Sequence, residues 1–263
     1  MSSVITRGRL FAAAVLAAFF WALWSVGLLE PDRLTRGMSN LGIFLSSLFP
    51  PDFSVLPTVA KGLVETVQIA IVGTLLGFIL AVPLALAASR SLFPPAITAP
   101  VRLVLAIIRT VPSLLWGVIF VVAVGLGAAA GALGVALYSL GYLGKLLYEA
   151  FEGVDGEVIE AVRGVGASRL QLARYAIIPE TANVVLSQLL FMFEYNVRAS
   201  SIMGFVGAGG IGFYLLGYIQ MLQYSKLTTA LLVTLVAVVA IDQASNWIRK
   251  ALVLPSEVSS VAP

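Results

Sequence analysis

The chain has 263 residues, of which 60% are hydrophobic and only 11% are charged, against about 25% charged residues in a soluble domain. This composition excludes an ordinary soluble domain, and a net charge of +3 without a basic stripe excludes a nucleic-acid-binding surface. The chain contains no histidine and no cysteine, which excludes Ser-His-Asp triads, thiol catalysis and thiolate zinc sites. We expect a polytopic membrane protein that is not an enzyme and has no metal site or cofactor of its own.

Six apolar stretches are long enough to form membrane-spanning helices, which need about 20 residues each. The first covers residues 10–29, and the second covers 66–89, with Gly73 and Gly77 at a spacing typical of close helix packing. The third covers residues 102–126, a tight turn is predicted at 125–134, and the fourth span reaches about residue 148. The fifth begins at Pro179 and weakens at Glu194, and the sixth covers 227–248.

The distribution of Lys and Arg predicts how these spans are oriented. With the N-terminus inside, most of the positive charges fall on or near the cytoplasmic side, and both termini are cytoplasmic. The segment 30–61 is then an external connection that contains an amphipathic piece at 41–49. We expect an all-α chain with a single transmembrane domain over residues 1–263, in which an N-terminal span and external segment (about 1–60) precede a core of about residues 61–250.

The segment 149–179 is the only long charged stretch of the chain. Aliphatic residues at 158, 159, 162 and 165 would lie on one face of a short helix that ends at Gly164 and Gly166. Ser168 can cap a second helix, and Pro179 would stop the segment and open the next span. The sequence therefore predicts a compact cytoplasmic projection of two short helices, although an ordinary connecting loop is the simpler alternative.

Part of this projection resembles the EAA motif of the membrane subunits of bacterial ABC importers. The resemblance is carried by Glu160, Ala161, Gly166, Ile178 and Pro179. Val162 stands where the motif has alanine, and Ala176 where a larger aliphatic is usual. The resemblance implies that these residues belong to coupling helices that dock into a cleft of an ATPase subunit.

Residues 63–249 are also similar to the PhnE-like permeases of phosphonate importers and to related permeases for phosphite and hypophosphite. The similarity lies in residues 65–70, 109–112, 194–200 and 207–212. It implies an inner-membrane permease that works as a homodimer within the lipid bilayer. It also implies two cytoplasmic ATPase subunits, which hold ATP and Mg, and an external phosphonate-binding protein.

A glycine cluster follows the fifth span. Gly207, Gly209 and Gly212 match the spacing of the dinucleotide fingerprint, but no acidic residue follows about 20 positions later, so we reject that interpretation. Together with Gly210 they instead predict a sharp bend or re-entrant segment, which must be buried or line a watery cavity. A packing role and a pathway role both remain open.

Charged residues within the spans are candidate pathway residues because burying a charge in a membrane is costly. Glu194 and Arg198 are spaced to form an ion pair near the outer end of the fifth span, which would fix helix packing. Alternatively, Arg198 with Asn196, Ser200 and Ser201 offers hydrogen-bond donors to a phosphonate or phosphite group. Arg109 either extends to the cytoplasmic interface or acts as a gate.

We therefore expect the permease subunit of an ATP-driven importer for phosphonates or related oxyanions, working by alternating access. The sequence has no phosphate-binding loop of the G-x-x-x-x-G-K-[ST] type, so ATP hydrolysis would belong to another polypeptide. The alternatives are a permease for another oxyanion or small solute, a secondary transporter, and a membrane scaffold. A secondary transporter would show inverted repeats, and the two halves show no such symmetry.

Overall fold

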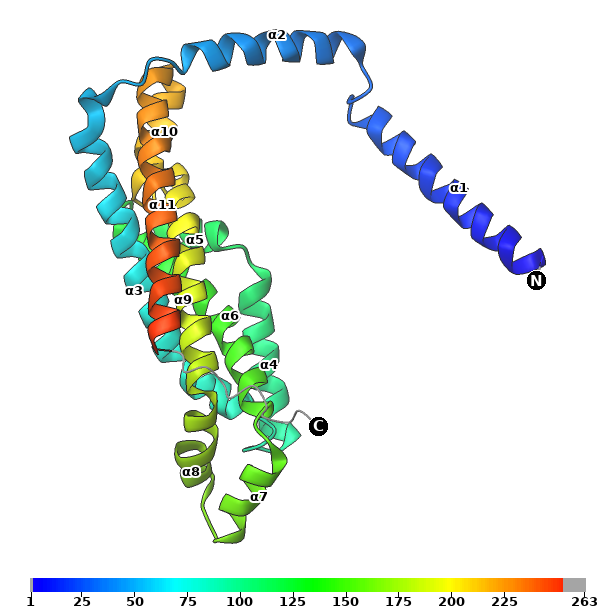
Figure 1. The fold of residues 1–263 in the computed structure, drawn as a ribbon, viewed down its shortest axis with the longest axis vertical. Coiled ribbons are helices and arrows are strands. Elements are labelled where there is room, and N and C mark those ends of the chain that lie inside the picture. Colours follow the sequence, from blue (N-terminus) through cyan, green and yellow to red (C-terminus); the bar gives the residue numbers. More distant parts are fainter. Residues whose placement is uncertain (1, 253–263) are drawn as a thin grey trace, which may run out of the picture. The chain divides into compact units, whose positions relative to one another are not determined.

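The computed structural model describes residues 2–252, with side chains described from residue 8 onward. The prediction that both chain ends are cytoplasmic concerns residue 1 and residues 253–263, which lie outside the described residues. Every regular element from 2 to 252 is a helix, which confirms the all-α prediction. The chain forms two compact units, Met1–Pro51 and Asp52–Pro263, and the helices of each are labelled in Figure 1.

The first unit consists of α1 (Ser2–Ser25) and α2 (Pro31–Ser47). Residues Gly8–Ser25 of α1 are long and apolar enough to cross a membrane, which confirms the first predicted span. Helix α2 begins at a proline, the residue best suited to a first helical turn, and carries its charges near that end. It is longer than the amphipathic piece predicted at 41–49.

The second unit holds the remaining helices in chain order. They are α3 (Leu56–Ala88), α4 (Pro95–Thr110), α5 (Ser113–Val124), α6 (Ala128–Glu152), α7 (Gly156–Gly164), α8 (Arg169–Leu172), α9 (Ile178–Met203), α10 (Ile211–Gln220) and α11 (Tyr224–Leu252). Among the described residues, five helical stretches are long and apolar enough to span a membrane, and six if α4 and α5 count as one broken span. The prediction of six spans is therefore confirmed when α4 and α5 are counted as one broken span.

The third predicted span is not one continuous helix. Helices α4 and α5 meet at an angle of 87°. Pro112 lacks a backbone N–H and disfavours helical geometry in the residue before it, and Val111 is accordingly extended, with φ −83° and ψ 120°. The predicted turn at 125–134 is shorter than expected: it is confined to residues 125–127, where Gly125 and Gly127 have positive φ, because α6 begins at Ala128. A Cβ atom at Gly134 would lie 2.8 Å from the backbone nitrogen of Gly117, so this glycine serves close packing of α6 on α5.

Helix α6 forms the centre of the core, where it packs against α3, α4, α5 and α9. Its buried face is rich in glycine and alanine, which lets the neighbouring backbones approach closely. On α3, the facing position is Gly77, where a Cβ atom would lie 2.5 Å from the Cβ of Ser139 and 2.7 Å from the carbonyl oxygen of Ala136. The packing of α3 on α6 therefore depends on the absence of a side chain here.

This packing predicts opposite effects for two identical substitutions. Gly77→Ala should lower the stability of the purified protein by about 1–3 kcal/mol, because the added methyl group overlaps α6. Gly217→Ala in α10 meets nothing within 4 Å and should be neutral or slightly stabilising, since alanine is the better helix former. Thermal unfolding in detergent measures both, and equal midpoints for the two variants would contradict the packing argument.

Candidate functional site

Helices α7 and α8 form a projection at one end of the core, which we call the knob (residues 155–177; Figure 1). The side chain of Asp155 accepts a hydrogen bond from the backbone of Glu157 at 3.0 Å and caps α7. Ser168 and Gln171 form a reciprocal capping box at the start of α8. Gly166 joins the two helices with a φ of +81°, which glycine adopts without strain. The predicted pair of short helices is therefore confirmed.

Pro179 does not end the knob, contrary to the sequence-based prediction. A π-helical segment, Ala173–Ile177, links α8 to α9, so helical backbone runs without a break from Arg169 to Met203. The backbone N–H of Ile178 donates to the carbonyl of Ala173, five residues earlier, and this wider turn accommodates a proline that cannot donate. The second half of the knob, from Arg169, is consequently a helical extension of α9.

The knob exposes one face and buries the other. Glu160 and Ala161 of the knob are exposed, as are Ile178 and Pro179 just after it, as expected of residues that meet a partner. Ile159 and the buried residues of α8 and the π-helical segment belong to the same apolar cluster as the ends of α3 and α6. The knob is thus anchored to the core by its inner face. Docking of its outer face to an ATPase stays a prediction.

A buried amide joins three helices in the middle of the core. Asn196 of α9 is fully buried, and its Nδ2 donates to the hydroxyl oxygens of Thr74 in α3 and Ser139 in α6, both at 2.8 Å. Thr74 donates its own hydrogen to the carbonyl of Ala70 at 2.6 Å, so it must accept from Asn196. Both amide hydrogens are therefore used, and in this conformation Asn196 has no donor left for an anion.

Ser200 and Ser201 lie on the following turn of α9 and are also buried. Ser201 donates to the carbonyl of Val197 at 3.0 Å. The Ser200 hydroxyl and the Oδ1 of Asn196 are buried polar atoms with no hydrogen-bond partner among the described residues. Neither atom is therefore committed to a partner within the described part of the chain.

Glu194 and Arg198 do not pair with each other, which corrects the predicted ion pair. Arg198 donates through Nη1 to both carboxylate oxygens of Asp242 at 3.0 and 3.1 Å, and Arg249 donates to Glu194 at 3.1 Å. Each helix contributes one acidic residue and one arginine: Glu194 and Arg198 lie on α9, whereas Asp242 and Arg249 lie on α11. Each charge is therefore paired with an opposite charge on the other helix. These contacts across the helix pair replace the local contact along α9.

The position of Glu194 along the membrane also differs from the prediction. Its partner Arg249 lies in the last turn of α11, at the end that the sequence analysis assigns to the cytoplasmic side. Glu194 therefore lies toward that end and not toward the outer one. The difference arises because the continuous helix that contains Glu194 begins at Arg169, within the knob, and not at Pro179.

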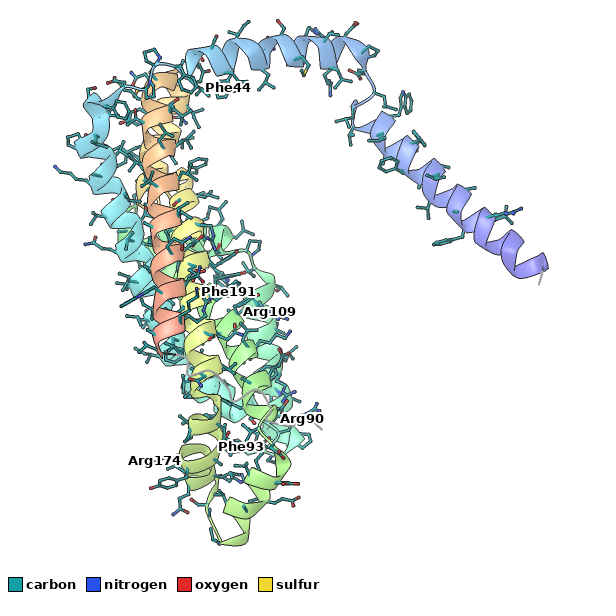
Figure 2. The ribbon with its side chains drawn as sticks, in the orientation of Figure 1. Phe44, Arg90, Phe93, Arg109, Arg174 and Phe191 are labelled. Carbon is teal, nitrogen blue, oxygen red and sulfur yellow. The ribbon has the colours of Figure 1, made fainter. Side chains whose placement is uncertain are left out.

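Arg109 lies in the last turn of α4, just before the break to α5 (Figure 2). Helices α4, α9 and α11 carry four arginines, and three of them pair with carboxylates: Arg102 with Glu152, Arg198 with Asp242, and Arg249 with Glu194. Arg109 is half-buried and has no ion pair with any described residue. Arg109 is thus the one of these four arginines whose charge is not balanced by a carboxylate of the described residues.

Three tyrosines that the sequence analysis did not single out form a stack, and one of them, Tyr138, lies near Arg109. Tyr138 stacks on Tyr142 with ring centroids 6.0 Å apart and on Tyr195 of α9 with centroids 5.7 Å apart. Arg109 is close enough to Tyr138 to interact with it electrostatically. The four-residue spacing of Tyr138 and Tyr142 on α6, in a stretch otherwise made of small and apolar residues, is the signal that could have identified them.

The glycine cluster forms a bend between α9 and α10, as the sequence predicts. Gly207, Gly209 and Gly210 all have φ near +80°, and Gly212 in the first turn of α10 lies in close contact with the backbone of α9. The hydroxyl of Thr66 accepts a hydrogen bond from the backbone of Ile211 at 2.8 Å and fixes the bend to α3. A pathway role for these glycines stays a prediction. In residues 2–252, no group of three or more acidic side chains could hold a metal ion.

Comparisons with known proteins agree with this architecture. The family model described as "Binding-protein-dependent transport system inner membrane component" matches residues 73–253. The phosphite transport system permease PtxC of Stutzerimonas stutzeri is 37% identical, over 90% of this chain and 87% of that protein. The phosphate-import permease PhnE of Mycolicibacterium smegmatis is also 37% identical, over 81% of this chain but only 40% of that protein.

A solved structure shares the fold. A chain of the MetNI methionine ABC transporter in an inward-facing conformation superposes with a TM-score of 0.68 at 24% sequence identity. The match covers 76% of this chain and 98% of that chain. At this identity the likeness supports the fold and says nothing about the solute.

The observed ion pairs predict which side chains are energetically coupled. Arg198→Ala should destabilise the protein because it leaves Asp242 unpaired, and Arg198→Ala with Asp242→Ala should recover much of that loss. A double-mutant cycle in thermal stability should give a coupling energy of roughly 0.5–3 kcal/mol for this pair. The matched cycle with Glu194→Ala, the partner expected from sequence, should give a coupling close to zero. Strong coupling to Glu194 and none to Asp242 would refute the observed pairing.

Proposed function

This chain belongs to the family of binding-protein-dependent transport system inner membrane components, and we propose that it is the permease of an importer for phosphonates or related reduced-phosphorus oxyanions. As a member of that family it is a multi-span membrane transport component and not an enzyme. The observation that carries the substrate class is its similarity, along nine-tenths of its length, to a relative named as a phosphite permease.

We propose that the importer contains a second copy of this chain, two cytoplasmic ATPase subunits that hold ATP and Mg, and an external oxyanion-binding protein. The knob and both chain ends would then face the cytoplasm of a bacterium, with the chain in the inner membrane. Two features support this arrangement. The sequence lacks a nucleotide-binding loop of its own, and the knob presents Glu160 and Ala161 on an exposed surface.

The continuity of the knob with α9 supports a mechanism for coupling. A partner that moves the knob would move α9 as one body, because helical backbone runs from Arg169 to Met203. Asn196 on that helix is hydrogen-bonded to α3 and α6, so the motion would reach the centre of the core. ATP binding and hydrolysis would then shift the population between inward-open and outward-open states.

Within the pathway, Arg109 is the residue we propose to meet the anion. A guanidinium group presents several N–H donors in a plane, which suits a phosphonate or phosphite group, and Arg109 has no carboxylate that competes for them. The hydroxyl groups of the adjacent tyrosine stack could add neutral donors. Arg198 is less suited to this role in the present conformation because Asp242 already accepts its hydrogen bonds.

The substrate class can be tested with the reconstituted importer. The permease, its ATPase and its binding protein would be placed in proteoliposomes, and ATP hydrolysis would be measured with methylphosphonate, phosphite, phosphate, sulfate and choline. Choline is included because stacked tyrosines can also bind a quaternary ammonium group. We expect stimulation by methylphosphonate or phosphite above the other solutes. Preferential stimulation by sulfate or choline would refute the proposed substrate class.

The same proteoliposomes test Arg109. Arg109→Ala should reduce oxyanion uptake by at least tenfold without loss of the ATPase from the complex, and Arg109→Lys should recover only part of it, because lysine keeps the charge but not the planar donors. The matched control is the double variant Arg198→Ala with Asp242→Ala, which removes a paired arginine and should keep most of the uptake. The reverse order of activities would assign the anion contact to Arg198.

The knob predicts a second pair of variants. Gly166→Val forces a branched residue into a left-handed conformation and should distort the junction of α7 and α8, so that the ATPase no longer co-purifies. Gly164→Val is the control, because that glycine is helical and a Cβ atom there also meets nothing within 4 Å. Both variants should reach the membrane in normal amounts. Retention of the ATPase by Gly166→Val would show that the knob is not the coupling element.

A further inference from the structure

A hollow of about 400 Å³ lies at the end of the core that carries the knob, between the knob and the loop that joins α3 to α4. Its walls are formed by residues 90–95 on one side and by Arg163, Ala167, Arg169 and Leu172 on the other. Figure 2 labels Arg90 and Phe93 at this end of the core, close to the knob. Two segments about 70 residues apart in sequence therefore share one small cavity.

The lining of this hollow is positively charged. It contains three arginines, Arg90, Arg163 and Arg169, and no carboxylate. None of the three guanidinium groups forms an ion pair with a described residue. Since the chain carries only sixteen positive side chains, three of them around one cavity is a strong local concentration of charge.

Neighbouring groups hold these arginines in place without neutralising them. Arg163 donates through one nitrogen to the backbone carbonyl of Ser91, and Arg169 lies over the ring of Phe93, 5.2 Å from its centroid. The backbone N–H of Arg90 donates to Glu152 at 2.6 Å, which fixes the backbone at this position, and the Arg90 guanidinium forms no ion pair with a described residue. A guanidinium has five N–H donors, so each of the three still has donors for a ligand.

The nearest acidic groups do not cancel this charge. Glu152 and Glu160 line an adjoining hollow together with Arg90 and Arg163. Glu152 is already bound to Arg102 and to the backbone of Arg90, and Glu160 is exposed on α7. The main hollow therefore keeps a net positive charge at neutral pH.

We propose that this hollow binds a phosphate-type anion, with the guanidinium groups of Arg90, Arg163 and Arg169 as its donors. A tetrahedral group with two negative charges matches several converging guanidinium groups, because each arginine can donate two parallel hydrogen bonds to it. The group could come from the headgroup of an anionic phospholipid or from free phosphate. In either case the ligand would connect the α3–α4 loop to the knob and restrain the coupling element. The proposal does not depend on which solute the permease carries.

The first arm of the test uses inorganic phosphate and the full-length chain in a neutral detergent. Isothermal titration should detect binding that weakens at least tenfold in Arg169→Ala and partly recovers in Arg169→Lys. Arg163→Gln should also weaken binding, and the polar replacement keeps a donor for the Ser91 carbonyl. The matched control is Arg174→Ala, which removes an exposed arginine of the same segment that does not line the hollow and should leave the affinity unchanged.

The second arm uses the chain in nanodiscs of phosphatidylcholine with and without phosphatidic acid. Hydrogen exchange of residues 163–172 should slow when the anionic lipid is present, and Arg169→Ala but not Arg174→Ala should abolish the slowing. A response to phosphate alone identifies the free ion as the ligand, and a response to the lipid alone identifies the headgroup. Either result supports the site.

Three outcomes would overturn the proposal. The first is a lack of arginine-dependent response in both arms. The second is an equal response of Arg174→Ala and Arg169→Ala, which would indicate attraction to the general positive charge of the knob. If Arg169→Ala instead weakened only the association with the ATPase, the hollow would belong to that interface and the anion site would also be refuted. None of these results would bear on the ligand panel that tests the transported solute.

Discussion

The buried amide of Asn196 is the contact on which the arrangement of the core depends. An apolar environment supplies no water for a polar group, so an unpaired amide there is costly and a paired one is strongly held. Asn196 uses both of its hydrogens to join α9 to α3 and α6, and the glycines on the facing sides of α3 and α6 let their backbones approach closely enough. The register of α9 against the core is thus set by hydrogen bonds as well as by packing.

The cost of leaving a buried polar group unpaired also explains the arrangement of the charged residues. Arg198 and Glu194 find opposite charges on α11, and Arg102 finds Glu152, so most arginines of the long helices contribute to assembly. Arg109 differs because the break at Pro112 ends its helix and the described part of the chain offers it no carboxylate. A half-buried cation without a partner is unfavourable for stability alone, and this imbalance is the physical basis for assigning it to the anion pathway.

Much of the fold could be predicted from local sequence signals. Apolar length located the spans, and Gly166 with Ser168 located the junction in the knob, because turn and capping preferences act over a few residues. The ion pairs could not be predicted in this way. Spacing along α9 suggested Glu194 with Arg198, but only the packing of α11 shows that Asp242 and Arg249 are available. The prediction that Pro179 ends the knob is also wrong, since a π-helical turn that accommodates a proline has no signature in a single sequence.

The rigidity of the knob places a physical limit on how the core can respond to a partner. Because α8, the π-helical segment and α9 form one continuous helix, a displacement of the knob cannot be absorbed by a flexible loop at Pro179. It must either tilt α9, against the hydrogen bonds of Asn196 and the ion pairs to α11, or change the contacts of the knob with the α3–α4 loop. The arginine-lined hollow lies between the knob and that loop, where an anion would favour one position of the knob over another. A bound phosphate group would therefore act on the same helix that carries the motion into the core.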